Sequence, residues 1–487
     1  MSETKPEEQA VPATASRPFD VHRWSDYPEL RNCLTELVRE LEGLESRRRQ
    51  RGEGGGKKFR EAVRALVLDM YVAWKTDPNL LVGIPRGNRS YTTKSRYQAL
   101  FLRWSSFIDA YDLLLQAGYI AEVHAGFHDP RSGVGRNTRI KATQKLIDLL
   151  SRRARLTLSD ISIRDEGFET IELRDSGKKP LEYEDTDDTL SMRNALGQIN
   201  AHLQRQWLDL RITDEEYGSL QSRMMRDYDQ GNREYPVIDL TRRALVRIFN
   251  NEDWQQGGRF YRGWWQSIPK EYRNRITIND KRTCEVDYST LHPVLLYARF
   301  GQRLVGDAYS IEAPNVPRAL IKQTFNKMIN ALGRINRPDD FSEDQIGMSW
   351  DQLQAAIAER HAAIKQSFNS GYGLQLQRLD SDLAQAVMLR FINSGHTCLP
   401  VHDSFIVHHA LADELKTIMV DEFKAMTGQT ITVKSLDGFQ PELEPDYEPV
   451  TQTMIPDDSW FKGTGEYTGY KQRQLDWYSK QVGSGSA

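Results

Sequence analysis

Two acidic residues in the second half of the chain stand where a carboxylate could bind a metal ion. Asp287 ends a short apolar segment that begins at Cys284, and Asp403 lies inside the alternating segment 396–410. An ionised acid among apolar strand residues is costly unless a cation compensates its charge, and Mg²⁺ prefers hard oxygen ligands. The acids are 116 positions apart (403 minus 287), so adjacent strands could hold them around two Mg²⁺ ions. The alternative for each acid alone is a turn or cap residue.

A positively charged helical segment lies between these acids. Residues 318–331 place Arg318 and Lys322 one helical turn apart, and apolar residues recur between them at helical spacing. Two cations at this separation can neutralise a triphosphate. The alternative for this helix alone is a solvated charged face.

The overall composition limits the class of protein that can carry these residues. The chain has 487 residues and a net charge of -3, with 39% hydrophobic and 27% charged residues, so we expect a globular protein of roughly two to four domains. Any nucleic-acid surface must be a local patch. Three widely separated cysteines predict neither a disulfide framework nor a zinc site. Without a long apolar stretch or an apolar leader, we expect a cytoplasmic protein with no membrane contact.

The N-terminal third predicts a tail and then a mostly helical domain. Residues 1–18 are polar and rich in Pro and Ala, which is typical of a disordered tail. In the domain at 19–152, apolar residues recur at helical spacing over 59–74 and 95–117. The basic segment 45–58 contains three consecutive glycines and predicts an extended loop.

A turn-rich basic ribbon follows the second of these helices. Residues 119–124 alternate like a strand, a basic turn follows, and another helix ends near Leu150. This order of helices and ribbon resembles a winged-helix DNA-binding domain, the alternative being an ordinary structural domain. The resemblance implies that basic residues of the wing contact DNA phosphates: Arg131, Arg136, Arg139 and Lys141.

Two other regions have no chemical motif. Residues 155–185 alternate as a strand pair, and 190–228 is helical with Thr213 placed to cap its second half. We expect the whole region 153–250 to be thumb-like or a connection between domains. The C-terminal extension 441–487 ends in SKQVGSGSA, which is typical of a linker or tag.

The segments around the acids and the basic helix resemble motifs A, B and C of family A DNA polymerases and the related single-subunit RNA polymerases. Asp287-Tyr288-Ser289 is similar to motif A, Arg318-x-x-x-Lys322 to the start of the fingers helix, and His402-Asp403 to motif C. Before motif A, residues 257–276 resemble a Thr-Gly-Arg stretch followed by Gln-Asn-Ile-Pro, and the likeness is carried by Arg259, Gln266, Ile268 and Pro269. Gly306-Asp307-Ala308-Tyr309 also resembles the Gly-x-Asp turn that precedes the fingers.

This resemblance implies a role for each matched residue. Asp287, Asp403 and the backbone carbonyl of Tyr288 would hold two Mg²⁺ ions, with Mn²⁺ able to substitute. Arg318 and Lys322 would bind the triphosphate. Three residues would lie against the primer end, namely Arg259, Gln266 and His402, and two would border the incoming sugar, namely His292 and Asn330.

The chain departs from the DNA-polymerase pattern at the sugar. His292 stands where these enzymes carry a glutamate that helps exclude a 2′-hydroxyl, and Asn330-Ala331 replaces the usual aromatic residue and glycine. Ser404 replaces the acid that often follows the motif C aspartate, which is more similar to the RNA-polymerase branch. The choice between dNTP and NTP is therefore open.

Together these features predict an α+β protein. Residues 251–440 would form a right-hand polymerase palm and fingers with an antiparallel palm sheet, and the N-terminal domain would be winged-helix-like. The expected function is template-directed addition of nucleotides to a 3′-hydroxyl without proofreading, with DNA template, primer and nucleoside triphosphates as partners. The alternatives are a primase or RNA polymerase of the same superfamily, or a non-catalytic DNA-binding replication initiator with a relic palm.

Overall fold

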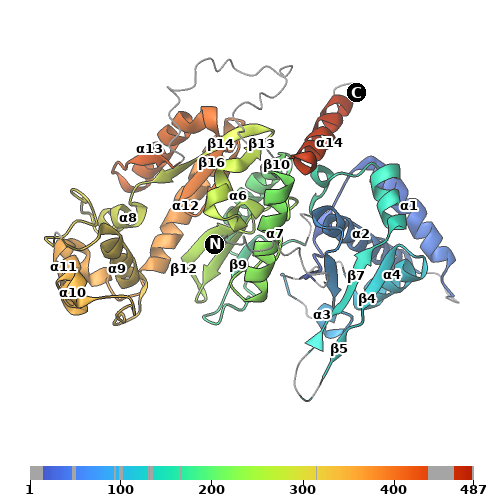
Figure 1. Cartoon of the computed structure of the whole chain (residues 1–487), viewed down its shortest axis with the longest axis horizontal. Coiled ribbons are helices and arrows are strands. Elements are labelled where there is room, and N and C mark those ends of the chain that lie inside the picture. The colour runs from blue at the N-terminus through green and yellow to red at the C-terminus, as the bar shows by residue number, and fades with distance from the viewer. Residues whose placement is uncertain are drawn as a thin grey trace, which may run out of the picture.

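The computed structural model describes most of the chain, in the ranges 15–46, 51–92, 95–97, 102–129, 131, 135–164, 167–313, 315–436 and 466–484. Within these ranges the protein is a mixed α and β structure. Two hydrophobic cores, one built mainly from residues 15–161 and one from 171–431, divide it into an N-terminal and a C-terminal body. The two bodies lie side by side (Figure 1). None of the helices in these ranges combines the length and apolar character that a membrane crossing requires.

The N-terminal body packs helices against a four-stranded sheet. Its main helices are α1 (Pro28–Gly43), α2 (Glu53–Thr76) and α4 (Trp104–Gln116), and its sheet has the order β1 (Ser16–Pro18), β3 (Leu81–Ile84), β7 (Thr138–Ala142), β4 (Ile120–His124). Helix α2 is the centre of this core because apolar residues occur around most of its circumference, and it packs on β3, β7 and α4. Shorter elements complete the body: β2 (Arg23–Trp24), α3 (Arg89–Thr92), α5 (Gln144–Ile147) and β8 (Ser162–Ile163).

Three expectations for this body are wrong. The helix expected over 95–117 begins only at Trp104, the first residue of α4, because the described residues 95–97 and 102–103 are not helical. Residues 16–18, assigned to the disordered tail, form β1, which pairs in parallel with β3. The segment 45–58, expected to be an extended loop, enters α2 at Glu53, so its three glycines are helical. Each glycine costs about 1 kcal/mol in a helix, but the adjoining turn is anchored by the fully buried Phe59, whose ring lies 3.8 Å from the Arg51 guanidinium. Tertiary packing therefore outweighs local propensity.

The basic ribbon is a hairpin extended from the sheet. Strands β4 and β7 pair antiparallel, and beyond them β5 (Phe127–His128) pairs with β6 (Gly135–Arg136). After β7 the chain turns into α5 and a π-helical turn over Asp148–Arg153, close to the end that the sequence predicts near Leu150.

The C-terminal body is built on a six-stranded antiparallel sheet. Its strand order is β10 (Leu208–Leu210), β13 (Ile276–Ile278), β14 (Lys281–Tyr288), β16 (Ser404–His408), β15 (Cys398–Val401), and β17 (Val433–Ser435) pairs with the far end of β14. The core residues of β14, β15 and β16 are almost continuously buried, because helices cover the sheet.

One long helix connects the parts of this body. Helix α12 (Gly373–Asn393) packs on α6 (Asp187–Gln204), α8 (Leu291–Arg299), α13 (Ala412–Thr427) and β15. It also packs on a three-stranded sheet of order β12 (Asp253–Tyr261), β11 (Val246–Asn250), β9 (Ile171–Leu173). Side chains from α12 can therefore reach both the sheet and the residues at the end of β12.

The region 153–250 is divided between the two bodies. Its first part, including β8, belongs to the N-terminal body, and from Ile171 onward most of it shares the core and both sheets of the C-terminal body. The expected helix over 190–228 is two helices, α6 and α7 (Asp214–Asp229), separated by β10. The whole segment is buried, and its apolar residues Leu208, Leu210 and Ile212 alternate with the polar Asp209 and Arg211. A strand places residues with this period of two on one side. Thr213 caps α7 as predicted: its hydroxyl accepts a hydrogen bond from the Glu216 amide.

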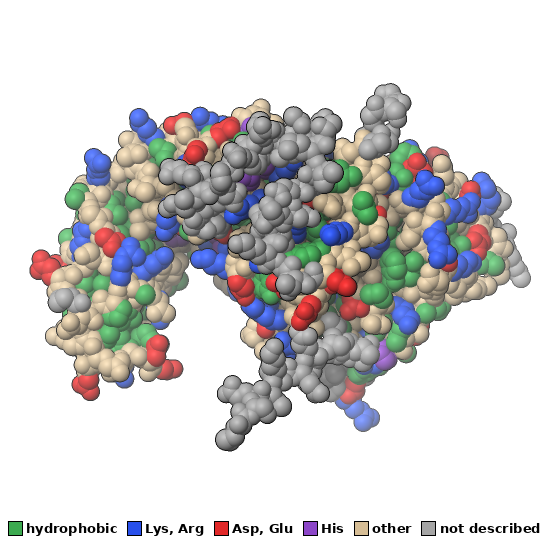
Figure 2. Space-filling model, turned by 45° about the horizontal axis from the view of Figure 1, so that its top comes forward, with side chains coloured by type: hydrophobic (Ala, Val, Ile, Leu, Met, Phe, Trp, Pro, Cys, Tyr) green, Lys and Arg blue, Asp and Glu red, His purple; other side chains and the backbone are tan. Residues whose placement is uncertain are grey.

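A small helical lobe stands at one end of the molecule. It contains α9 (Arg318–Asn330), α10 (Glu343–Ile346) and α11 (Trp350–Arg360) (Figure 1). Figure 2 shows a hollow between this lobe and the body that carries the six-stranded sheet, with Lys and Arg side chains at its rim.

The C-terminal helix α14 (Thr468–Ser484) lies at the junction of the two bodies (Figure 1). Arg473 forms an ion pair with Asp209 of the larger body at 2.7 Å, and Lys480 pairs with Asp160 of the N-terminal core region at 3.1 Å. The expectation that residues 479–487 are only a linker or tag is wrong as far as Ser484, because α14 continues to that residue. Most of the remaining extension, 441–465, lies outside the described residues.

Candidate active site

The two predicted acids lie together at the end of the large sheet. Strands β14 and β16 pair so that Asp287 is directly opposite Ser404, the residue that follows Asp403. Asp403 itself occupies the tight turn between β15 and β16, where His402 adopts a left-handed conformation with φ 59°. A second left-handed residue, Thr290 with φ 56°, turns the chain from β14 into α8. Both acids are therefore presented by rigid elements at the same sheet edge.

The electrostatics of the pair indicate a site short of positive charge. Burial and the neighbouring charge of Asp403 raise the pKa of Asp287 to about 7, although Lys434 and Lys322 oppose the shift. Lys434 stands opposite Asp287 on β17, and Lys322 belongs to α9 in the helical lobe. The acids thus face the helical lobe, and neither forms an ion pair of 4 Å or less among the described residues.

A third acid lies behind the pair. Glu285, two residues before Asp287 on β14, accepts a hydrogen bond from the Ser404 hydroxyl and forms an ion pair with Arg273 at 3.3 Å. Its charge also contributes to the raised pKa of Asp287. Ser404 therefore binds an acid supplied by the neighbouring strand.

The donor set suits Mg²⁺ better than a metal held entirely by protein. Among the described residues no group of three or more His, Cys, Asp or Glu side chains is placed to hold one ion. Mg²⁺ is commonly bound by one or two carboxylates together with substrate phosphates and water, rather than by a full protein cage. Asp287 and Asp403, with the carbonyl of Tyr288 beside them on β14, fit that pattern.

The cations of α9 are held differently from each other. Arg318 forms a bidentate ion pair with Asp307, at 2.6 and 2.8 Å, so it is oriented by the Gly306–Tyr309 turn. Lys322 makes no ion pair among the residues that the structure describes, and its ammonium lies 5.9 Å from the centre of the Tyr309 ring. Tyr309 also lies near Asp403, since burial and the Asp307 and Asp403 charges raise its pKa to about 12 against the opposing effect of Arg318. Lys322 is thus, together with Lys434, a cation available near the acids.

Arg259 and His292 meet on an acid that the sequence analysis did not single out. Asp380 of α12 is almost fully buried and accepts hydrogen bonds from the Arg259 guanidinium, at 3.0 Å from its Nε. The Nε2 atom of His292 lies 2.8 Å from Asp380 Oδ2 and 3.1 Å from Arg259 Nη2. His292 therefore has its ring position determined by Asp380 and Arg259.

The remaining residues of the predicted primer site are placed in the same neighbourhood. The Gln266 amide donates to the backbone carbonyls of Phe260 and Pro400, at 2.9 and 3.1 Å, so this side chain braces β15. His402 is exposed, and its ring lies 6.4 Å from that of Tyr261. The side chain of Tyr288 is buried, with its hydroxyl donating to the Met419 carbonyl at 2.9 Å. The structure gives Gln266 and Tyr288 supporting positions.

Asn330 lies apart from His292 in the described contacts. It ends α9, donates to the Asn326 carbonyl at 2.7 Å, and packs so closely on Gly373 that an added Cβ there would lie 1.9 Å from the Asn330 carbonyl oxygen. Its contacts therefore join α9 to the start of α12 and do not include His292.

The four wing residues occupy one ribbon. On β7, Arg139 and Lys141 alternate with the buried Thr138 and Ile140 and so face outward. Arg131 and Arg136 are exposed on the hairpin, where the Arg136 guanidinium lies 5.5 Å from the Phe127 ring centre.

Two of the site residues that the sequence analysis missed had a detectable signal. Asp380 interrupts an apolar stripe on α12, four residues after Leu376 and four before Ala384, which indicates a buried acid in need of a partner. Glu285 shares the two-residue period of Asp287, which places both on one face of a strand. Lys434 had no comparable signal because its position depends on the pairing of β17 with β14.

No family model matches the sequence, and no curated protein matches it significantly.

Proposed function

We propose that the protein is a template-directed nucleotidyltransferase related to family A polymerases, which adds nucleotides to a 3′-hydroxyl. The observation that carries the proposal is the pairing of β14 with β16, which brings together two acids that form no ion pair among the described residues, with Lys434 and Lys322 as nearby cations. A site with this charge imbalance suits a substrate that arrives with divalent cations and phosphates.

Asp287 and Asp403, with the Tyr288 carbonyl, would hold two Mg²⁺ ions. When bound, such ions lower the pKa of the attacking hydroxyl and stabilise the charge on the phosphates. Lys322 would neutralise phosphate charge during transfer, and Arg318, oriented by Asp307, would flank it. Arg259 would lie against the primer end while Asp380 keeps its guanidinium in place.

The sheet and helices around the acids support assignment of residues 251–440 as a palm with a helical fingers lobe. The hollow between lobe and sheet offers a course for the template and primer (Figure 2). The N-terminal body would bind duplex DNA through its β5–β6 ribbon as a winged-helix-like domain.

A primase or RNA polymerase of the same superfamily is the second candidate. It is favoured by Ser404, whose hydroxyl binds Glu285 in place of a second motif C acid, and by His292 in place of the sugar-excluding glutamate. A non-catalytic initiator is disfavoured, because two half-buried acids without compensating cations are costly to keep unless they bind something.

The proposal is tested by primer extension with purified protein and Mg²⁺. The dNTPs and NTPs are offered separately, on DNA and RNA templates, with and without a primer. Template-dependent incorporation that disappears in Asp287→Asn supports the proposal, and the productive combination identifies the polymerase class. No incorporation in any combination, or full incorporation by Asp287→Asn, would overturn it.

A further inference from the structure

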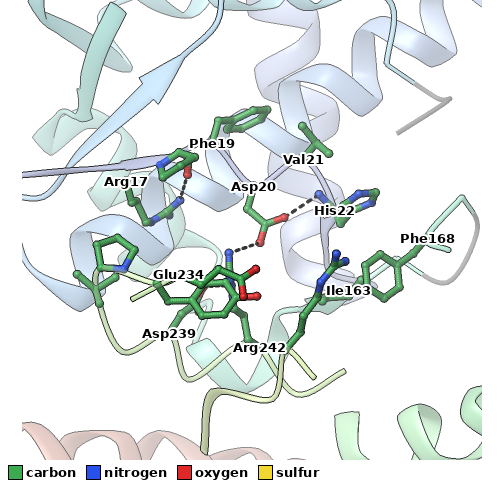
Figure 3. Close-up of a pocket in the computed structure, with 15 residues that line it drawn as sticks. Arg17, Phe19, Asp20, Val21, His22, Ile163, Phe168, Glu234, Asp239 and Arg242 are labelled. Atoms are coloured by element: carbon green, nitrogen blue, oxygen red, sulfur yellow. Dashed lines mark hydrogen bonds and ion pairs between the residues drawn. The ribbon is translucent and has the colours of Figure 1, made fainter. Parts of the chain in front are cut away.

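A cavity of about 310 Å³ lies at the seam between the two bodies, away from the acid pair. Figure 3 shows residues of the N-terminal body along one side, residues of the loop between α7 and β11 along the other, and Phe168 with Ile163 closing one end. Its volume is at the lower end of the roughly 300–1,000 Å³ usual for small-molecule sites.

Aromatic rings supply flat apolar surface in this cavity. Phe168 and Tyr235 are half-buried, and the ring of His22 meets the Phe168 ring edge-on with centroids 5.1 Å apart. The Arg242 guanidinium covers one face of the Tyr235 ring at 4.3 Å. Half-buried aromatic and guanidinium planes are the surfaces on which nucleobases stack.

The charges of the cavity fall into two sets. Asp20 and Asp239 are already compensated by Arg242, at 3.5 and 3.3 Å, and by Arg23 behind them. Glu234 is exposed and makes no ion pair among the described residues. Its carboxylate is hydrogen-bonded to the neighbouring Tyr235 and keeps further acceptor positions for a ligand.

Arg262 supplies hydrogen-bond donors to the same cavity. Its Nη2 atom binds the buried Glu172 at 2.7 Å, and the guanidinium stays one-third exposed with donors to spare. The residue has φ 79°, and the next residue, Gly263, has no room for a Cβ, which would lie 2.5 Å from the Trp265 ring. A non-glycine residue held at positive φ is uncommon and is often found at a binding site. Nearby, His22 Nδ1 is buried without a hydrogen-bond partner among the described residues.

We propose that this cavity binds one nucleotide unit whose base carries an amino group, stacked on Phe168 and Tyr235. The amino group donates to Glu234, and the phosphate is bound by Arg262. The unit comes either as a free nucleotide or as part of a single strand. Because the cavity is lined by both bodies, the bound nucleotide joins them, and binding requires no nucleotidyl transfer.

The decisive probe is the pair CMP and UMP, which differ at the base only in an amino group and an adjacent ring proton. Binding is measured by equilibrium dialysis in EDTA, so that metal-dependent triphosphate binding at the acid pair does not contribute. We expect CMP to bind about tenfold more tightly than UMP. Glu234→Gln should remove that preference, and Arg262→Ala should weaken both ligands by about tenfold. The matched controls Glu343→Gln and Arg334→Ala alter exposed residues in the helical lobe and should change nothing.

The same comparison with short oligo(dC) and oligo(dT) distinguishes the two sources. Tighter binding of CMP identifies a free nucleotide, and a dC preference seen only with oligonucleotides identifies a single strand; either result supports the proposal if Glu234→Gln abolishes it. In unmodified protein, a photoreactive azido-cytidine nucleotide should label residues near Phe168 or Tyr235, which tests the site even if a variant fails to fold. Absence of any preference, or labelling confined to the acid pair, would overturn the proposal.

Discussion

Two groups of acids in this molecule have opposite charge balance. At the seam between the bodies, Asp69 is fully buried and accepts a bidentate ion pair from Arg17 at 2.7 and 2.9 Å, with Arg23 as a second partner. Arg23 also binds Asp239, to which Thr241 donates two hydrogen bonds. At the sheet edge, Asp287 and Asp403 have no such partners among the described residues.

The pKa values reflect the same difference. Burial alone would raise the pKa of Asp239 and Asp20, but Arg23 and Arg242 outweigh it, lowering that of Asp20 to about 2 and that of Asp239 further. Burial and the Asp403 charge together raise the pKa of Asp287 to about 7. Acids that hold the fold together come with their cations, whereas a binding site leaves charge for its ligand to neutralise.

The largest effect should come from removing one of the unpaired acids. We expect Asp403→Asn to lower nucleotide addition by at least about a hundredfold, the scale of losing one charge-stabilising group in an active site. Asp287→Asn should do the same, and the double variant should lose little more because both acids serve one site. Rates of primer extension at saturating Mg²⁺ measure the effect.

The control is Asp413→Asn, which alters an exposed acid at the start of α13. It should leave the rate unchanged, and all variants should keep the circular dichroism spectrum and the DNA affinity of the parent protein. Substantial activity in Asp403→Asn would show that the pair is not a metal site.

Replacing an acid that already has arginine partners should lower the stability of the protein. Asp69→Asn leaves Arg17 and Arg23 buried beside a neutral amide, and breaking a buried ion pair in this way typically costs about 3–5 kcal/mol. We expect a loss of that size in the free energy of unfolding, measured by urea denaturation at pH 7. Asp351→Asn, which removes an exposed partner of Arg334, should cost less than about 1 kcal/mol. Equal effects would contradict the contrast between the two groups.

Asp287→Asn should raise the free energy of unfolding, whereas Asp69→Asn lowers it. The size of the increase should depend on pH. Because the folded pKa is about 7 and the ordinary value is 3.8, the folded protein keeps a proton that the unfolded chain releases over this interval. Stability of the parent protein is therefore lost as pH rises from about 4 to 7. The variant should be more stable by up to about 4 kcal/mol above pH 7 and by little at pH 4. Urea unfolding in EDTA at both pH values tests this, and an advantage that is equal at both would contradict it.

The difference between the two groups of acids also explains which of their features could be predicted from the sequence. Asp287 and Asp403 stand out because each is an acid beside apolar strand residues, one at the end of β14 and one in the turn between β15 and β16, and strand pairing was sufficient to bring them together. In the compensated group Asp69 also interrupts an apolar helix, but its partners come from β1 and β2, inside and just after the assigned tail, where no local pattern points to them. Local patterns indicate an unusual residue but do not name its partner.

Partners distant in the chain account for most of the differences. His292 was expected beside Asn330, whereas the structure joins it to Asp380, 88 residues away, through the packing of α12 on α8. The glycines of α2 were expected to break a helix, but core contacts made after residue 56 extend it. Both outcomes depend on tertiary packing that no short window of sequence contains.

His292 belongs to neither group of acids. It contacts the buried Asp380, which already forms an ion pair with Arg259. His292→Ala should change the ratio of dNTP to NTP incorporation by at least about tenfold, because removing a buried polar partner typically costs about 1–3 kcal/mol. Activity with the preferred sugar should remain, as His292 does not contact the acid pair. His292→Gln, which can still reach Asp380, should change the ratio less. Equal losses for both sugars would assign His292 a packing role beneath α8.

The wing has the opposite charge to the acid pair, because its basic residues lie together on one ribbon. Arg131, Arg136 and Lys141 are exposed and make no ion pair with the described residues, and Arg139 shares the outward face of β7. Cations kept without carboxylate partners are suited to phosphates, whose binding releases counterions and makes affinity depend on salt. Replacing all four with alanine should weaken duplex binding and reduce the slope of log affinity against log salt by up to about 0.9 for each phosphate that the ribbon no longer binds.

The smallest effect expected of this quadruple variant is on catalysis. A loss of duplex binding without a loss of nucleotide addition makes the test specific to the wing. With primer and template in excess, nucleotide addition should continue at close to the parent rate, because the wing is in the N-terminal body and the acids are in the other. A matched variant, Arg390→Ala, removes an exposed cation paired with Asp421 and Glu422 and should leave the salt slope intact. If the slope is unchanged in the quadruple variant as well, the ribbon has a structural role, and the proposal that it binds duplex DNA is wrong.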